Sequence, residues 1–448
     1  MVAHTSNRQY SLAHTLMRIE DNQKSSGSRL ARHLLDLKRE VISAAQDTTL
    51  QDDREFVEKL RTAQKLATVE LPQETILTSL RYSEMEYRQR SITPHVHPAY
   101  DWIFEEENAG QKVRYNSWLN KGDGIFWVTG KIGSGKSTLM KHIYNDKRTE
   151  SALERWAKGR KLLRASHYFW SAGTKKQRSY KGLLMSILYK ILHACPDLIE
   201  PVCQVRWHDE LRGLDTSSMA WQDDDLQRCL DKLVTSDLKS GGRAICFCFF
   251  IDGLDEYEGS YEVVDTLVRL AQSGHTKICA SSRPWNTFDR AFRESKAVGN
   301  YLILHQHTRD DIKRFILGEL KWALRELRQV DEEWMPLIEE VVARSEGVFL
   351  WVALVTVGEL RPMLTNREHI SSVRTRLNAI PDGMYVRRKC SEHANQSFRP
   401  RPVLSADFRP DLCQQVVQRG DRQDFQGLHC SRRTTADRCQ RGDDFHHP

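Results

Sequence analysis

The 448-residue sequence lacks the features that mark secreted and membrane-spanning proteins. Its N-terminus contains no apolar core of the kind found in a secretory signal. The longest uncharged apolar stretch, residues 347–358, is too short to cross a bilayer. None of the ten cysteines forms a C-x-x-C pair. We therefore expect a reduced, cytoplasmic protein without a transmembrane segment.

Strong charge of one sign is also missing. The net charge of +7 is modest for this length and does not by itself indicate a nucleic-acid partner. The contents of 40% hydrophobic and 28% charged residues are ordinary for a soluble protein, and the length allows roughly two to four domains. We find no internal repeat.

The stretch 124–144, GIFWVTGKIGSGKSTLMKHIY, carries the clearest functional pattern. A short apolar run leads into G-x-x-x-x-G-K-S and then into apolar residues at helical spacing, which is the order of a phosphate-binding loop. Backbone N–H groups of such a loop and the helix N-terminus hold the phosphates, Lys136 adds a positive charge, and Ser137 can bind Mg²⁺. The predicted phosphate-binding residues are Gly130, Lys131, Ile132, Gly133, Ser134, Gly135, Lys136, Ser137 and Thr138.

A second element of a triphosphate site follows the apolar run 244–251. Asp252 comes directly after this run, at the strand end where open α/β sheets bind ligands, so it is the expected Mg²⁺ partner of Ser137. Asp255 and Glu256 come after a tight turn and are candidates to contact the attacking water, with Glu256 the better base.

Arg283 follows the next candidate strand and is predicted to reach the same crevice, where it would report whether the γ-phosphate is present. No N-K-x-D motif for guanine occurs downstream, which favours ATP/ADP as the nucleotide.

Strands and helices alternate after the phosphate loop, which predicts βαβ units and a doubly wound parallel sheet in an α/β P-loop NTPase fold. The candidate strands are 125–129, 164–170, 244–251, 277–281 and 300–304. Amphipathic spacing predicts helices at 29–45 and 54–69, with Pro72 ending this arm. The predicted domains are a helical arm at 1–75, a helical lead-in at 76–121, the NTPase domain at 122–305, a helical subdomain at 306–382 and a basic, disordered tail at 383–448.

With these motifs assigned, residues 76–381 resemble the fungal NACHT-domain proteins, the NOD-like-receptor branch of the signalling (STAND) P-loop NTPases. The resemblance rests on MEYRQRSI, the phosphate loop, FFIDGLDEYEG, SSRPW and GVFLWVALV. A small residue followed by Asp-Glu after Asp252 is particular to NACHT modules. The family pattern stops near residue 383, which implies a module truncated after its NACHT core. The tail is either genuine or the product of a shifted reading frame or a retained intron, which transcript sequencing would distinguish.

The resemblance implies an ATP/ADP-dependent switch that oligomerises after nucleotide exchange and is reset by slow hydrolysis, as in heterokaryon incompatibility, non-self recognition or programmed cell death. It assigns Asp252, Asp255 and Glu256 to the Walker B group and Arg283 to the sensor. It also places Arg88 and Ile92 against the adenine. Two other interpretations stay open: a nucleotide-binding scaffold without a working cycle, and an unrelated P-loop enzyme such as a kinase or a constitutive ATPase. The sequence names neither the trigger nor the downstream effector.

Overall fold

The computed structural model describes residues 53–92, 100–105, 114–214, 216, 219–235, 237–259, 261–294, 300–325, 330–366 and 368–380, with parts of 32–40. The predicted tail 383–448 and most of the predicted helix 29–45 lie outside these residues. All of the described residues belong to one unit of the chain, Met1–Ser397.

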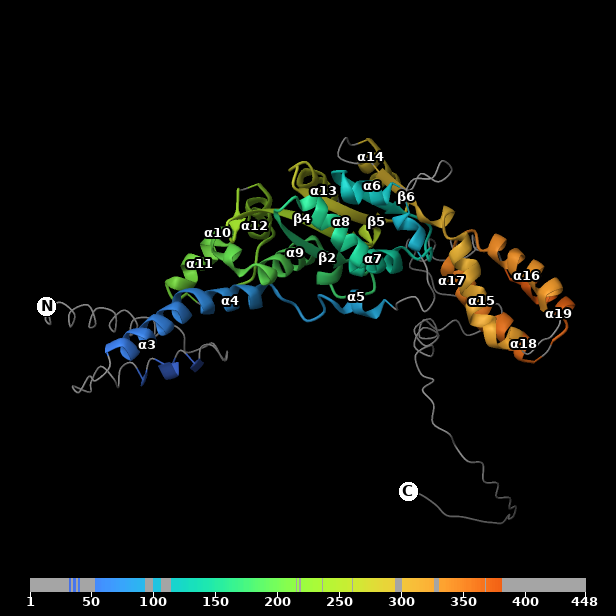
Figure 1. The fold of residues 1–448 in the computed structure, drawn as a ribbon, viewed down its shortest axis with the longest axis horizontal. Coiled ribbons are helices and arrows are strands. Elements are labelled where there is room, and N and C mark those ends of the chain that lie inside the picture. The colour runs from blue at the N-terminus through green and yellow to red at the C-terminus, as the bar shows by residue number, and fades with distance from the viewer. Residues whose placement is uncertain are drawn as a thin grey trace, which may run out of the picture. The chain divides into compact units, whose positions relative to one another are not determined.

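A parallel sheet lies at the centre of the described region (Figure 1). Its strands stand in the order β2-β4-β5-β1-β6, and a short strand, β3, pairs antiparallel with β4. The strands are β1 (Gly124–Thr129), β2 (Lys161–Tyr168), β3 (Lys239–Ser240), β4 (Arg243–Asp252), β5 (Thr276–Ser282) and β6 (Asn300–Ile303). The expected α/β fold with a doubly wound parallel sheet is confirmed, and each of the five predicted strands is present with its ends shifted by at most three residues.

Strand β4 is apolar along almost its whole length because helices cover both faces of the sheet. Cys246, Cys248 and Phe250 belong to the core on one face, whereas Phe247 and Phe249 belong to the core on the other. The cysteines are buried and unpaired, so they act as small hydrophobes, as expected. A strand buried on both faces cannot alternate between apolar and polar residues, which explains the continuous run.

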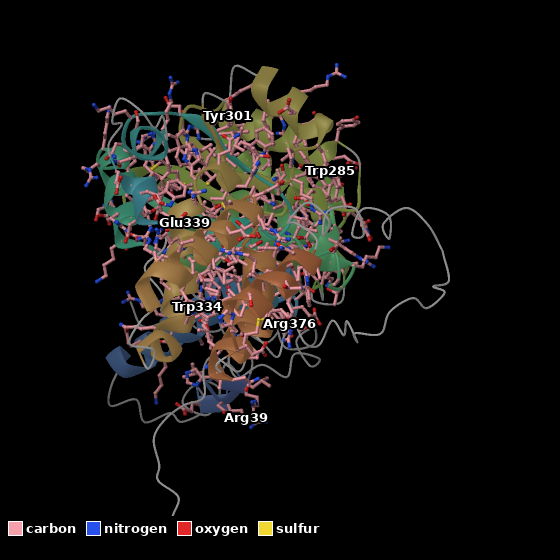
Figure 2. The ribbon with its side chains drawn as sticks, turned by 90° about the vertical axis from the view of Figure 1, so that its right-hand side faces the viewer. Arg39, Trp285, Tyr301, Trp334, Glu339 and Arg376 are labelled. Atoms are coloured by element: carbon pink, nitrogen blue, oxygen red, sulfur yellow. The ribbon has the colours of Figure 1, made fainter. Side chains whose placement is uncertain are left out.

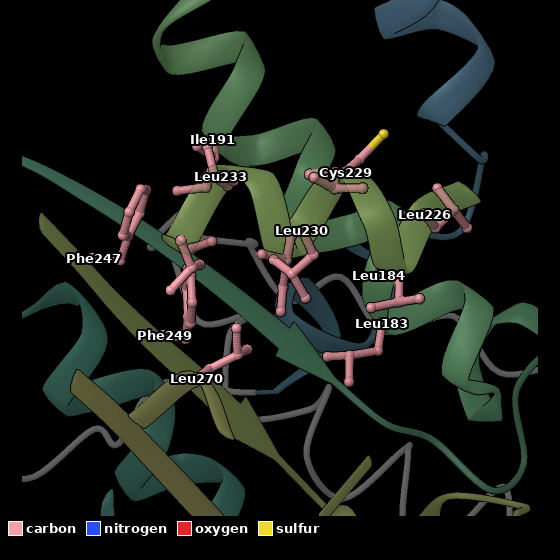
Figure 3. Packing of buried hydrophobic residues seen from close by; sticks show 14 of the residues in the cluster. Leu183, Leu184, Ile191, Leu226, Cys229, Leu230, Leu233, Phe247, Phe249 and Leu270 are labelled. Carbon is pink, nitrogen blue, oxygen red and sulfur yellow. The ribbon is translucent and has the colours of Figure 1, made fainter. Parts of the chain in front are cut away.

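One face of the sheet is covered by α9 (Tyr180–Ala194), α12 (Asp223–Thr235) and α13 (Glu262–Ala271). Figure 3 shows leucines of α9 and α12, Leu183 and Leu230 among them, gathered over Phe247 and Phe249 of β4. The other helices in this part of the chain are α10 (Ile199–Val202), α11 (Gln204–Leu211) and α14 (Asn286–Glu294).

The opposite face is covered by α6 (Tyr115–Asn120), α7 (Lys136–Asn145) and α8 (Lys147–Ala157). Helix α8 was not anticipated. Its start is nevertheless marked in the sequence, because the side chain of Asp146 accepts a hydrogen bond from the Arg148 N–H as an N-cap. Its buried residues, Leu153 and Trp156 among them, join the core on this face.

Helical structure continues across Pro72, so the prediction that this proline ends the N-terminal arm is wrong. Helix α3 (Asp53–Lys65) runs through a π-helical turn (Leu66–Glu70) into α4 (Leu71–Leu80), with Pro72 in the first turn of α4. The π turn changes the hydrogen-bond register just before the proline, and a missing N–H is tolerated in a first turn. The proposed domain limits stay predictions, although α4 spans the one at residue 75.

A set of helices follows the sheet: α15 (Arg309–Arg325), α16 (Val330–Arg344), α17 (Phe349–Val355), a π turn (Thr356–Leu360), α18 (Arg361–Thr365) and α19 (Ile370–Ala379). We call this set the helical subdomain. Arg309 and Lys313 of α15 both pair with Glu339 of α16, at 2.8 and 2.5 Å. Figure 2 labels Glu339 with Trp334 on the same helix.

Among the described residues, no single helix combines the length and the apolar composition needed to cross a bilayer. The bent pair formed by Tyr180–Ala194 and Pro196–Val202 meets these two criteria only when both helices are taken together.

The packing of α12 on the sheet generates a stability prediction. Leu230 is fully buried in the core shown in Figure 3, so Leu230→Ala leaves a cavity and should lower the free energy of unfolding by about 2–5 kcal/mol. Leu211→Ala is the matched control, because Leu211 is 44% exposed and its loss should change stability by only about 0.5 kcal/mol. Urea unfolding measures both. Equal losses in the two variants would contradict the packing described.

His167 of β2 generates a prediction about pH. Both ring nitrogens are buried without a hydrogen-bond partner, and the ring packs edge-on against Phe169 with the centroids 4.5 Å apart. Burial, assisted by the charge of Lys190, lowers the pKa of His167 to about 3. In the unfolded chain His167 is protonated below about pH 6.5, whereas in the folded chain it stays neutral. The free energy of unfolding should therefore fall by up to about 1.4 kcal/mol for each pH unit below about 6.5.

The contribution of neutral His167 to the free energy of unfolding is therefore fully present above about pH 6.5. It is lost progressively as the pH is lowered below that value. His167→Leu should reduce the slope of stability against pH between about 6 and 4, since this range lies between the two pKa values. His208→Gln, at an exposed site, should retain the wild-type slope. An unchanged slope in His167→Leu would show that this histidine is not held neutral.

Candidate nucleotide-binding site

The phosphate loop spans Gly130 to Gly135, between the end of β1 and the start of α7, as the sequence predicted. Gly133 and Gly135 have φ angles of +71° and +92°, which non-glycine residues rarely adopt. A Cβ atom at Gly135 would also lie 2.5 Å from the Tyr100 hydroxyl oxygen. The loop thus needs glycine at these positions both for its backbone conformation and for space.

Lys136 is the first residue of α7, and its ammonium group turns back over the loop. Its Nζ donates to the carbonyl oxygens of Gly130 and Lys131, at 2.9 and 3.0 Å. Burial lowers the pKa of Lys136, while the charges of Asp255 and Asp252 oppose this shift. None of the ion pairs between described residues involves Lys136, so its charge is available to a phosphate.

The other predicted residues of the loop lie in sequence around this lysine. Lys131, Ile132 and Ser134 belong to the turn, and Ser137 and Thr138 belong to the first turn of α7. The Ser134 hydroxyl oxygen is buried and has no hydrogen-bond partner among the described residues. A phosphate oxygen held in the loop is an acceptor that this hydroxyl could use.

Asp252 ends β4 and is 1% exposed. Burial raises the pKa of its carboxyl group, and hydrogen bonds from the hydroxyls of Ser137 and Ser281 oppose this shift. The Ser281 hydroxyl donates to Asp252 Oδ1 at 2.5 Å and accepts from the Gly253 N–H at 3.1 Å. The structure therefore brings together the two predicted Mg²⁺ ligands, Ser137 and Asp252, on neighbouring elements.

Asp255 and Arg283 contact each other directly. The Arg283 side-chain Nε lies 2.8 Å from Asp255 Oδ2, and the Arg283 backbone N–H donates to Oδ1, also at 2.8 Å. The side chain of Asp255 is 3% exposed and that of Arg283 is 32% exposed, so the carboxylate end of this ion pair is shielded from water. Arg283 lies at the predicted edge of the sheet, but its guanidinium group is held by a carboxylate in this conformation.

Glu256 is oriented toward the segment that follows β2. Its Oε2 accepts hydrogen bonds from the backbone N–H and the hydroxyl of Ser171, at 2.8 and 3.1 Å. The charge of Glu256 still acts on Lys136, together with those of Asp252, Asp255 and Arg283. The charges of all three predicted catalytic side chains, Asp255, Glu256 and Arg283, therefore act on the loop lysine.

Arg88 belongs to α5 (Tyr87–Ser91), which packs on β2. Its guanidinium carbon lies 6.0 Å from the centre of the Trp170 ring, its Nε is buried without a hydrogen-bond partner, and its charge favours the ionised form of Asp252. The charge of Arg88 therefore acts on one of the two side chains, Ser137 and Asp252, that would hold Mg²⁺. Ile92 is buried, and its carbonyl oxygen accepts from Lys141 Nζ at 2.5 Å. The adenine contact implied for both residues stays a prediction.

The helical subdomain contacts the phosphate loop, and sequence reasoning assigned no role to the residues involved. The Leu350 N–H donates to the Gly133 carbonyl oxygen at 3.0 Å, and Lys131 Nζ lies 2.6 Å from Glu346 Oε2. The Tyr100 hydroxyl also lies 3.5 Å from the Gly135 carbonyl oxygen. Leu350 falls within the GVFLWVALV block, the one sequence signal that covered part of this contact.

Mg²⁺ and a nucleotide fit the residues present. Mg²⁺ prefers oxygen ligands, and the Ser137 hydroxyl and the Asp252 carboxylate supply two. The loop offers the backbone N–H groups at the start of α7 and an ammonium group that is not neutralised by a direct ion pair. Together they match the chemistry of a metal-bound polyphosphate.

Comparison with known proteins agrees with the assignment of a P-loop NTPase-like module to this chain. The family model described as "Nephrocystin 3, N-terminal" matches residues 100–283, a segment that contains the phosphate loop, Asp252 and Arg283. No curated protein matches the chain. A chain of "Structure of Drosophila ORC bound to DNA" aligns at 12% identity with a TM-score of 0.30, covering 70% of this chain and 83% of that one. The geometry of the phosphate loop, the buried Asp252 and the family match together indicate a P-loop NTPase-like, nucleotide-binding module.

Ser281 generates a prediction for this site. Ser281→Ala removes the donor to Asp252 and the acceptor for the Gly253 N–H, so the carboxylate loses one of the two hydroxyls that orient it. We expect the Mg²⁺ concentration needed for half-maximal ATP binding to rise about tenfold, the equivalent of one hydrogen bond to a charged group.

Ser282→Ala is the matched control, because the Ser282 hydroxyl accepts from the Trp127 indole N–H and donates to the Arg283 carbonyl oxygen, with no contact to Asp252 in these bonds. A fluorescent ATP analogue titrated with MgCl₂ measures both variants. The same Mg²⁺ requirement in both would assign no role to Ser281 in positioning Asp252.

Proposed function

We propose that this protein is an ATP/ADP-dependent signalling switch of the NACHT type, which binds Mg-ATP at the phosphate loop and hydrolyses it slowly to reset. The contact of the helical subdomain with the loop supports this proposal most directly. The Gly133 carbonyl and the Lys131 side chain bind Leu350 and Glu346, more than 200 residues away in the sequence. A change in the loop on nucleotide exchange would break or shift these contacts and reach the C-terminal helices.

The residues of the site have distinct roles in this proposal. Lys136 and the backbone N–H groups of the loop hold the phosphates, and Ser137 and Asp252 hold Mg²⁺, which neutralises charge on the β- and γ-phosphate oxygens when bound. Glu256 orients the attacking water, and Arg283 senses the terminal phosphate.

Two contacts support slow turnover. Glu256 is engaged by Ser171, and Arg283 is engaged by Asp255, so neither side chain is poised for hydrolysis in this conformation. Both contacts must rearrange before water and γ-phosphate can be aligned, and this requirement lowers the rate of the chemical step.

The wider role rests on the resemblance to NACHT proteins. By that resemblance the exchanged, ATP-bound form self-associates and engages a downstream effector, in non-self recognition or programmed cell death. A scaffold that binds ATP without turnover and a constitutive ATPase are the competing functions, and the experiment below separates all three.

The test is nucleotide content and turnover of the purified full-length chain, measured for wild type, Lys136→Ala and Glu256→Gln. Lys136→Ala removes the ammonium group over the loop and should weaken nucleotide binding about tenfold to a hundredfold. Glu256→Gln should retain binding and lower the hydrolysis rate by about 10²-fold or more, since it removes a general base.

Lys232→Ala and Glu258→Gln are matched controls at exposed positions and should behave as wild type. Tightly held ADP with very slow hydrolysis in wild type supports the switch. Retained ATP without turnover would indicate a scaffold. Steady hydrolysis without a trigger, abolished by Glu256→Gln, would indicate a constitutive ATPase and overturn the signalling proposal.

A further inference from the structure

A cavity of about 500 Å³ lies beside the edge strand β2, away from the phosphate loop. It is open to solvent and is bordered by α5, α7, β2 and α9, which contribute Arg90, Lys141, Arg164 and Lys190 in that order. Its size is in the range of small-molecule binding sites. Four cationic side chains from four separate elements thus line the same cavity.

The positive charge of this cavity is only partly balanced. Arg90 pairs with Glu86, which also lines the cavity, at 2.5 Å, and Arg164 lies 3.2 Å from Glu150. Lys141 and Lys190, by contrast, donate to neutral oxygens in the hydrogen bonds found among the described residues. Lys141 Nζ donates to the Ile92 carbonyl oxygen at 2.5 Å, and Lys190 Nζ donates to the carbonyl and hydroxyl oxygens of Ser166 at 2.6 and 2.9 Å.

Burial disfavours the charged form of both lysines. Burial lowers the pKa of Lys190 to about 8, against which only the charge of Glu86 acts, and burial also lowers the pKa of Lys141. An ammonium group that is partly removed from water is unfavourable when no carboxylate lies within hydrogen-bond distance. An anion bound between Lys141 and Lys190 would offset this desolvation cost.

The cavity is separate from the nucleotide site. In the register of the sheet, Arg164 of β2 lies opposite Cys248 of β4, whereas the strand end at Tyr168 lies opposite Asp252. Arg164 therefore stands four residues before the level of Asp252, roughly 13 Å along the strand. Lys141 lies more than a turn beyond Lys136 on α7, and Lys136 itself binds carbonyl groups of the loop.

We propose that this cavity binds a small polyphosphate anion, at a site distinct from the one that holds nucleotide at the phosphate loop. Arginine presents planar pairs of donors that match phosphate oxygens, and lysine adds point charges. Tyr144 and Tyr189 also line the cavity and offer hydroxyl donors and ring edges to an organic phosphate. Inorganic polyphosphate and inositol polyphosphates share this chemistry.

The test is isothermal titration calorimetry on the full-length chain carrying Lys136→Ala, which weakens binding at the phosphate loop. Inorganic tripolyphosphate and inositol hexakisphosphate are titrated in separate experiments at about 0.1 M salt, because charge interactions are screened at higher salt. We expect saturable binding of one molecule of at least one probe, and the tighter of the two identifies the type of phosphate.

Lys141→Gln and Lys190→Gln, each added to that chain, should weaken this binding about tenfold or more. Lys232→Gln, at an exposed position, is the matched control and should leave it unchanged. Arg90→Gln covers the case in which a buried lysine variant does not fold, because Arg90 is exposed and its loss leaves Glu86 unpaired beside the cavity. Absence of binding by both probes, or binding that survives all three cavity variants, would overturn the proposal.

Discussion

The burial of one carboxylate constrains the whole nucleotide-binding region. Asp252 is almost fully enclosed at the end of β4, and a carboxylate without partners would be strongly unfavourable there. Its hydroxyl partners come from two other elements, Ser137 from α7 and Ser281 from β5. Satisfying this group therefore aligns the ends of three neighbouring strands, because the loop before α7 continues from β1. The same alignment places oxygen ligands where a metal ion would bind.

The phosphate loop is contacted by residues from two distant parts of the chain. Tyr100 packs on Gly135, and Leu350 and Glu346 hold Gly133 and Lys131. Asp255, the buried partner of the ion pair with Arg283, lies in the same region. Few of these interactions involve residues near one another in sequence, so the conformation of the loop depends on the packing of the helical subdomain against the sheet.

Helices α5 and α7 connect the nucleotide site with the basic cavity. Helix α5 places Arg88 near Asp252 and Arg90 at the cavity, and α7 carries Lys136 at its start and Lys141 further along. The bond from Lys141 to the Ile92 carbonyl joins the two segments. An anion in the cavity and a nucleotide in the loop would thus act on the same pair of helices.

The sequence alone determined the elements whose signals are local. A run of apolar residues ending in Asp252 must be a strand covered on both faces, and the glycines before Lys136 allow one kind of turn, so the fold class and the phosphate loop could be predicted. Pro72 was misread because its effect depends on the π turn before it, and α8 was missed although Asp146 caps it.

Only the tertiary structure decided which distant side chains meet. The hydroxyl of Ser281 beside Asp252, the pairing of Glu346 with Lys131 and the four cations of the cavity join residues from separate elements. No local sequence pattern marks these residues, because a serine, glutamate or lysine can also occupy an exposed position at little cost in stability. Packing of the helices on the sheet selects those that are brought together.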